Sequence, residues 1–190
     1  MGSSDGDTWH NFSASDECND FSLERGEEIH VQLRWSDGWG WSNRDLDLYL
    51  IDTADLIGGR FSLADAVAKS ENTQAGVFGN YPFEFLSYTA NTSGDYCLAV
   101  KHYSGAQPSW IQMQVWGNYE PLEYFTRAGS MTNPGESANS GMLAVGAADW
   151  ADISTIESFS SQGPAPDGRI KPDIVGADGG SSVTLSLIHI

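Results

Sequence analysis

Apolar and polar residues alternate in short runs through the first two-thirds of the chain. The clearest run, residues 29–35, reads IHVQLRW, and its alternate side chains are apolar. Successive side chains of a β-strand point to opposite faces, so this pattern predicts a strand with one buried face. Similar runs predict the other strands. They cover residues 21–23, 46–52, 82–88 (through Phe83, Phe85 and Leu86), 96–103, 110–116 and 122–125.

Residues 62–70 fit either a capped helix or a strand near 66–70, and we prefer the strand. Sequences typical of turns separate the predicted strands. They lie at residues 24–27, 36–40, 91–94 and 105–108. Seven or eight strands spaced in this way predict a mainly β fold, an antiparallel and jelly-roll-like sandwich over residues 17–126, preceded by a polar loop at 1–16.

The composition changes after residue 126. Residues 127–140 are small and polar, which is typical of a linker or crossing loop. Residues 141–148, GMLAVGAA, form a continuous apolar run, which predicts a strand buried on both faces, as in a parallel sheet. Closely spaced Gly and Pro residues over 159–175 exclude a long helix and indicate an ordered loop around short strands.

Charge and hydropathy exclude several classes of protein. Lys and Arg total 9 and Asp and Glu total 26, for a net charge of −17, which argues against binding to nucleic acid or to an anionic membrane. No run approaches the roughly 20 apolar residues of a membrane helix. The first residues lack the basic and apolar regions of a signal peptide.

The chain has two cysteines, Cys18 and Cys97. A bridge between them would close a loop of about 80 residues, worth about 4 kcal/mol in the chain-entropy model. The alternative is that Cys97, in a predicted strand, is a small buried apolar residue. The spacing alone does not decide between these two interpretations.

Two segments near the C-terminus carry a resemblance to a known family. Residues 143–149 read LAVGAAD and residues 156–178 read IESFSSQGPAPDGRIKPDIVGAD. Together they resemble the stretch of the subtilisin-like serine proteases (subtilases) that leads toward the nucleophilic serine. The resemblance implies that residues 127–184 are an incomplete subtilisin-like α/β catalytic domain. It also implies a secreted endopeptidase that acts on protein or peptide substrates without an organic cofactor.

The predicted sandwich resembles a second family. Residues 45–50 (DLDLYL) and 94–100 (GDYCLAV) are similar to the pre-peptidase C-terminal modules of secreted bacterial proteases. Some subtilases carry such a sandwich as an insert ahead of the VGA strand. The order of segments in this chain is similar to that arrangement.

The catalytic motifs of the resembled family are not found in the chain. Subtilases use an Asp, a His and a Ser, with an Asn side chain in the oxyanion hole. Three of these motifs would lie upstream of residue 156. The serine motif would follow residue 173, where the sequence instead ends in LSLIHI, an anomalous tail over 185–190. The resemblance therefore implies that the chain holds no catalytic residue and is inactive by itself.

The resemblance places Phe159, Ser160, Ser161 and Gly163 at the border of the substrate cleft. Judged from the residues alone, neither serine has a G-x-S-x-G elbow or an arranged base, so a turn stabilised by hydroxyl groups is the preferred interpretation. The histidines are expected to be surface or turn residues rather than a catalytic base. This applies to His10, His30 and His102, whereas the fourth histidine, His189, belongs to the anomalous tail and is not expected to be catalytic.

Asp45 and Asp47 share one face of a predicted strand. With Asp37 or Asp52 they would supply oxygen ligands of the kind that Ca²⁺ prefers. The alternative is simple solvation of a highly acidic protein.

Trp35, Trp39 and Trp41 surround a predicted turn. Exposed aromatic side chains on a loop stack on sugars or dock partners, whereas buried ones cap a core. The first interpretation gives an alternative function, a non-catalytic β-sandwich module that binds protein or carbohydrate. A third alternative is an unrelated surface protein with an accidental match at residues 156–164.

Overall fold

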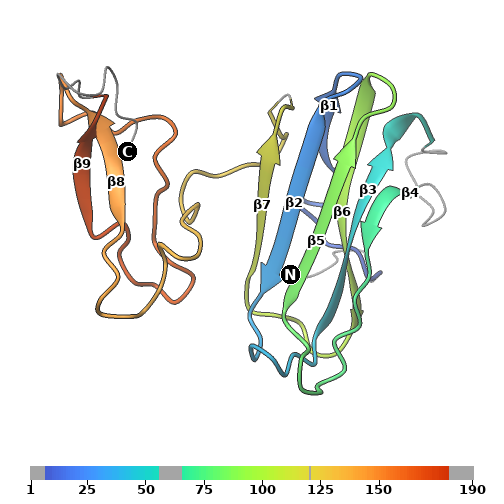
Figure 1. Ribbon diagram of the computed structural model, residues 1–190. Helices are drawn as coiled ribbons and strands as arrows, with labels where there is room; N and C mark the ends of the chain where they lie inside the picture. Colours follow the sequence, from blue (N-terminus) through green and yellow to red (C-terminus); the bar gives the residue numbers. More distant parts are fainter. Residues whose placement is uncertain (1–6, 56–65, 120, 180–190) are drawn as a thin grey trace. The chain divides into compact units, whose positions relative to one another are not determined.

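A computed structural model describes residues 7–55, 66–119 and 121–179 (Figure 1). The chain divides into two compact units, Met1–Phe125 and Thr126–Ile190, which are described separately. The tail predicted over 185–190 lies outside the described residues.

The first unit consists of two antiparallel sheets, which confirms the prediction of a mainly β fold. One sheet has the strand order β1-β6-β3-β4 and the other has the order β5-β2-β7. The strands are β1 (Asn19–Leu23), β2 (Glu28–Trp35), β3 (Asp45–Asp52), β4 (Ala66–Ser70), β5 (Phe83–Thr89), β6 (Gly94–Ser104) and β7 (Ile111–Gly117). A single 3-10 turn, η1 (Thr53–Asp55), follows β3.

Apolar side chains from the inner faces of both sheets form one core. In β2 the alternation places Ile29, Val31 and Leu33 in it, all fully buried. β3 contributes Leu46 and Leu48 in the same way. Each such side chain stabilises the fold by about 1.5–3 kcal/mol relative to an exposed one. The sandwich therefore depends on this single apolar layer.

One carboxylate lies among these apolar residues. Glu84 of β5 pairs with Leu33 of β2 and is fully buried. Its oxygens accept hydrogen bonds from Ser70 Oγ, from the backbone and side chain of Asn72, and from Gln74 Nε2 (2.9 Å). Because Ser70 ends β4, Asn72 and Gln74 follow it, and Glu84 belongs to β5, this network joins the two sheets. Burial raises the pKa of Glu84, against the effect of these hydrogen bonds.

The N-terminal segment covers the outer face of the four-stranded sheet. The backbone N–H of His10 donates to the carbonyl of Val100 at 2.8 Å. The Trp9 ring meets the Tyr49 ring edge to face, with 5.5 Å between centroids. This contact explains why β3 is buried on both faces although its outer side chains are partly polar.

The strand predicted over residues 122–125 is wrong. Instead, the Asn19 side chain binds the backbone of Tyr124 with two hydrogen bonds of 2.9 Å, one donated and one accepted. Pro121 precedes the segment and has no N–H to donate to a sheet. A side chain therefore holds this segment where strand pairing was expected.

The second unit contains a parallel pair, β8 (Val145–Asp149) and β9 (Ile174–Asp178). The parallel arrangement agrees with the sequence prediction, but burial on both faces does not. Val145 is 54% exposed, while Ala148 is buried. In the described part of this unit, β8 and β9 form a two-stranded sheet, and there is no helix or second sheet to cover both of its faces.

Among the described residues, no helix is long and apolar enough to cross a membrane.

Replacing Gly117 by Ala tests the packing at the end of β7. Gly117 has φ +135°, and a Cβ there would clash with the carbonyl oxygen of Glu28 in the neighbouring strand. We expect Gly117→Ala to reduce the free energy of unfolding by about 2 kcal/mol or more. Gly94→Ala is the matched control, because a Cβ at Gly94 meets nothing within 4 Å. Urea unfolding followed by tryptophan fluorescence would measure the free energy of unfolding of both variants. An equal loss of stability in the two would contradict the close approach of Gly117 to Glu28.

Candidate functional site

The segment around Ser160 packs directly on β8. The backbone N–H of Ala147 donates to Ser160 Oγ at 3.0 Å. A Cβ on Gly146 would lie 3.1 Å from the same oxygen and 2.8 Å from Cγ of Pro172. Glycine at this position therefore allows Ser160 and Pro172 to approach the strand closely. Ser160 joins the loop to the sheet through this hydrogen bond.

The rest of the predicted cleft border is built around backbone contacts. Gly163 lies so close to Lys171 that a Cβ would clash with the Lys171 carbonyl. Its own carbonyl accepts a hydrogen bond from the Gly129 N–H at 3.1 Å. Phe159 is 65% exposed and Ser161 is also exposed. The structure thus places these four predicted residues on one loop, with an aromatic ring left accessible beside Ser160.

The described part of this unit offers no histidine base for a serine nucleophile. Residues 126–179 contain no histidine, and His189 lies outside the described residues. A serine needs a base within hydrogen-bond reach to become a nucleophile. The geometry therefore favours a structural role for Ser160.

The histidines of the first unit are held by packing. Burial lowers the pKa of His10 to about 4, so it is neutral at pH 7. His30 stacks against Trp116 and Phe85, with ring centroids 5.7 and 6.3 Å away. His102 Nδ1 lies 3.3 Å from the amide nitrogen of Gln107. None of these contacts is the Ser–His or Asp–His pair that a triad requires.

The two acidic residues proposed as calcium ligands are both buried on β3. Burial raises the pKa of Asp47 to about 6, and the negative charges of Asp45, Glu71 and Glu84 add to the effect, whereas a hydrogen bond from Tyr49 opposes it. The Tyr49 hydroxyl lies 3.2 Å from Asp47 Oδ2 and 2.7 Å from Glu71 Oε1. Lys69 pairs with Glu71 at 2.7 Å and lowers the pKa of that carboxyl, so the carboxylates that would favour a bound proton or a cation are Asp45 and Asp47.

The other two acids suggested with them are engaged elsewhere. Asp37 accepts hydrogen bonds from Ser42 Oγ and from three backbone amides. Asp52 accepts one from the backbone of Ala54 at 3.0 Å. Asp45 and Asp47 are therefore the part of the predicted set that remains, and calcium binding there stays a prediction.

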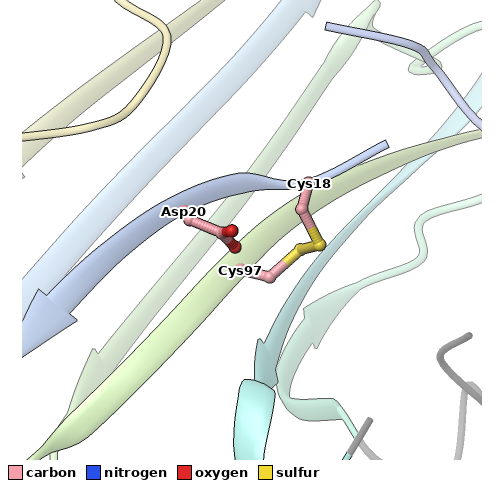
Figure 2. Close-up of side chains that lie close together, drawn as sticks. All are labelled: Cys18, Asp20 and Cys97. Atoms are coloured by element: carbon pink, nitrogen blue, oxygen red, sulfur yellow. A yellow bond between two sulfur atoms is a disulfide. The ribbon is translucent and has the colours of Figure 1, made fainter. Parts of the chain in front are cut away.

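A disulfide joins Cys18 to Cys97, and Asp20 lies beside it (Figure 2). Among the described residues, these three form the one group whose potential ligand atoms lie within 4.8 Å of each other. Metals bind the thiolate, which a disulfide does not provide, so this group is not a metal site in the oxidised protein. The bridge instead fastens the N-terminal segment to β6. Burial raises the pKa of Asp20, as do its acidic neighbours.

The three tryptophans take different roles. Trp35 is buried and its indole N–H donates to the carbonyl of Arg44 at 3.1 Å. Trp39 and Trp41 are 64% and 58% exposed. Their ring partners, Tyr81 and Phe78, were missed in the sequence. The only sequence signal was an aromatic pair within a glycine-rich turn, GVFGNY, at residues 76–81.

Comparison with known proteins identifies the class. The sequence model of the subtilase family matches residues 45–189, so the chain belongs to the subtilase family. No protein with a curated description matches it.

Among solved structures, the chain is similar to the Clostridium perfringens CspB protease, with a TM-score of 0.53 and 18% sequence identity. The match covers 86% of this chain and 36% of that protease, so the chain spans about a third of its length. This likeness shows a shared fold.

Replacing Asp47 by Asn tests the electrostatic strain in the β3 cluster. Because the folded-state pKa is raised, the stability contributed by protonated Asp47 is complete below about pH 4 and is lost as the pH rises through about 6. We expect Asp47→Asn to raise the free energy of unfolding by about 1–2 kcal/mol at pH 8 in EDTA, and to change it little at pH 3.5. Urea titrations at both pH values would measure this.

The exposed Glu28 provides the control, and Glu28→Gln should show no such gain at pH 8. Adding Ca²⁺ in place of EDTA tests the metal prediction in the same assay. If Asp45 and Asp47 bind Ca²⁺, millimolar Ca²⁺ stabilises the unsubstituted protein but not Asp47→Asn. A destabilised Asp47→Asn variant at pH 8 in EDTA would contradict the account of the pKa.

Proposed function

We propose that the chain is a segment of a secreted subtilisin-like serine endopeptidase, in which an all-β sandwich precedes part of the catalytic domain. The observation that carries this proposal is the second unit. The two sequence segments that resemble subtilases form its parallel pair β8–β9. The loop of Ser160, which lies between these strands in the sequence, packs on β8. The family match supports the same interpretation.

The reaction proposed for the whole protease is hydrolysis of a peptide bond through a serine acyl-enzyme. In this chain, Phe159 and its neighbours to Gly163 would border the cleft for the substrate. The exposed ring of Phe159 supports this role, because an apolar side chain on a loop with anchored ends presents a surface to a ligand. The anchors are the hydrogen bonds of Ser160 to β8 and of Gly163 to residue 129.

We also propose that the sandwich is an insert of the pre-peptidase C-terminal type and that the protein is secreted. The disulfide between Cys18 and Cys97 supports secretion, because such bonds persist in oxidising compartments. The continuous order of sandwich, β8 and β9 along one chain supports the insert.

The 190-residue chain is expected to be inactive by itself. Ser160 Oγ is engaged with the Ala147 amide, and residues 126–179 around it contain no histidine to act as a base. The purified chain should neither hydrolyse casein nor react with a fluorophosphonate probe, under conditions in which an intact subtilisin does both. Ser160→Ala and Ser161→Ala variants should be indistinguishable from it. Probe labelling that disappears in either variant would overturn the prediction.

A further inference from the structure

Five large apolar side chains lie exposed at one end of the sandwich. Two loops contribute them, the β2–β3 loop over residues 36–44 and the β4–β5 loop over residues 71–82, at the lower end of the sandwich in Figure 1. We call this set the aromatic end surface. Its members and their exposures are Trp39 (64%), Trp41 (58%), Val77 (56%), Phe78 (79%) and Tyr81 (45%).

The rings of the aromatic end surface are paired across the two loops. Trp39 contacts Tyr81 with centroids 5.1 Å apart, and Trp41 contacts Phe78 at 5.5 Å. Both pairs are tilted, so ring faces remain accessible. An exposed apolar cluster of this kind on a soluble protein marks an interaction site, because burial of the same rings in the core would be more favourable.

Hydrogen bonds hold the two loops rigidly against each other. The N–H of Gly79 donates to the carbonyl of Gly40 at 2.9 Å, and the N–H of Ser42 donates to that of Asn80 at 3.0 Å. The side chain of Asn80 accepts from the amide of Val77 at 3.2 Å. The rings are therefore positioned before any ligand arrives, which reduces the entropic cost of binding.

Asp37 fixes the conformation of the first loop from within. Its carboxylate accepts hydrogen bonds of 2.7–2.9 Å from Ser42 Oγ and from three backbone amides. Burial alone would raise the pKa of Asp37, but these hydrogen bonds lower it below its usual range. The negative charge of Asp37 is therefore satisfied by hydrogen bonds within its own loop.

The aromatic end surface is neutral, in a chain of net charge −17. Residues 71–82 carry one charged side chain, Glu71, which pairs with Lys69 of β4 at 2.7 Å, and residues 36–44 carry two, Asp37 and Arg44. Arg44 donates to the carbonyl of Ser36, so both charges face the loop itself. The remaining polar groups nearby are amides and hydroxyls. A neutral surface of aromatic rings bordered by amides and hydroxyls matches a sugar, whose C–H face stacks on a ring while its hydroxyls form hydrogen bonds.

The aromatic end surface lies at the end of the sandwich where β2 ends and β7 begins. In the pairing of β2 with β7, Trp35 lies opposite Ile111 and Ile29 lies opposite Gly117. The aromatic end surface follows Trp35, whereas Gly117 lies at the other end of β7.

We propose that the aromatic end surface binds a neutral polysaccharide by stacking sugar rings on Trp39 and Trp41. The proposal does not depend on proteolysis, since the surface belongs entirely to the sandwich. Its ligand class is an uncharged glycan with an exposed apolar C–H face, such as a β-linked glucan or chitin.

The test is retention of the 190-residue chain on microcrystalline cellulose and on chitin, with cellohexaose and chitohexaose titrated by tryptophan fluorescence. We expect retention on at least one of these polymers, and at least a tenfold weaker association constant for the double variant Trp39→Ala/Trp41→Ala. Phe85→Ala/Trp116→Ala is the control, because these rings are also exposed but lie on the β5-β2-β7 sheet, outside the aromatic end surface. Its association constant should change less than twofold.

Thermal unfolding should give similar midpoints for both double variants and the unsubstituted chain, because all four rings are exposed. No retention on any of the glycans would overturn the proposal. Equal loss of retention in the two double variants would also overturn it. A third contrary result would be that the chain is retained on a protein matrix such as gelatin rather than on a glycan, and that Trp39→Ala/Trp41→Ala abolishes this retention. A failed protease assignment would change none of these outcomes.

Discussion

The apolar layer between the two sheets is the interaction on which the rest of the sandwich depends. Side chains at alternate positions of β2 and β3 supply it, and Val31 and Leu48 in these strands are completely buried. Because the period of a strand is two, the same alternation sends every other side chain outward. The loops that carry the aromatic end surface and the acidic cluster on β3 both take their positions from this register.

The sandwich buries the carboxylates of Glu84 and Asp47 next to that layer, and these two groups differ in how many hydrogen-bond donors they have. Glu84 accepts hydrogen bonds from three donor residues and links the sheets. Asp47 has Tyr49 as a donor, but burial, and to a smaller extent three neighbouring acids, raise its pKa to about 6. A buried polar group costs stability unless its partners are present, so Glu84 specifies the pairing of the sheets while Asp47 weakens the fold at neutral pH.

The sequence predicted most strands because their alternation is local, as in residues 29–35, where the structure has β2. The sequence did not predict which side chains of β5 face the core. The run FEFLSYT suggested Phe83 and Phe85 as the apolar phase, yet Glu84 and Leu86 face inward and Phe85 is 42% exposed. Only the tertiary fold brings Ser70, Asn72 and Gln74 to Glu84, and those donors lie 10–14 residues away in sequence.

In the candidate sites, too, the sequence predicted what lies in one local segment and missed what the tertiary fold brings together. The resemblance placed Phe159 to Gly163 on one loop, because their motif is contiguous. The pairing of Trp39 with Tyr81 joins residues from separate loops, so no local pattern contains it. The role of Trp35 was also open, and burial in the core separates it from its two neighbours in the motif.

A different constraint applies to the second unit, namely that parallel strands need both faces of their sheet covered. Parallel strands occur almost only in sheets whose two faces are covered, and a pair of strands does not bury both. In the described part of this unit, Val145, Ile174 and Val175 are each about half exposed on β8 and β9. The exposed apolar side chains of β8 and β9 are therefore positions on which further strands or helices would pack.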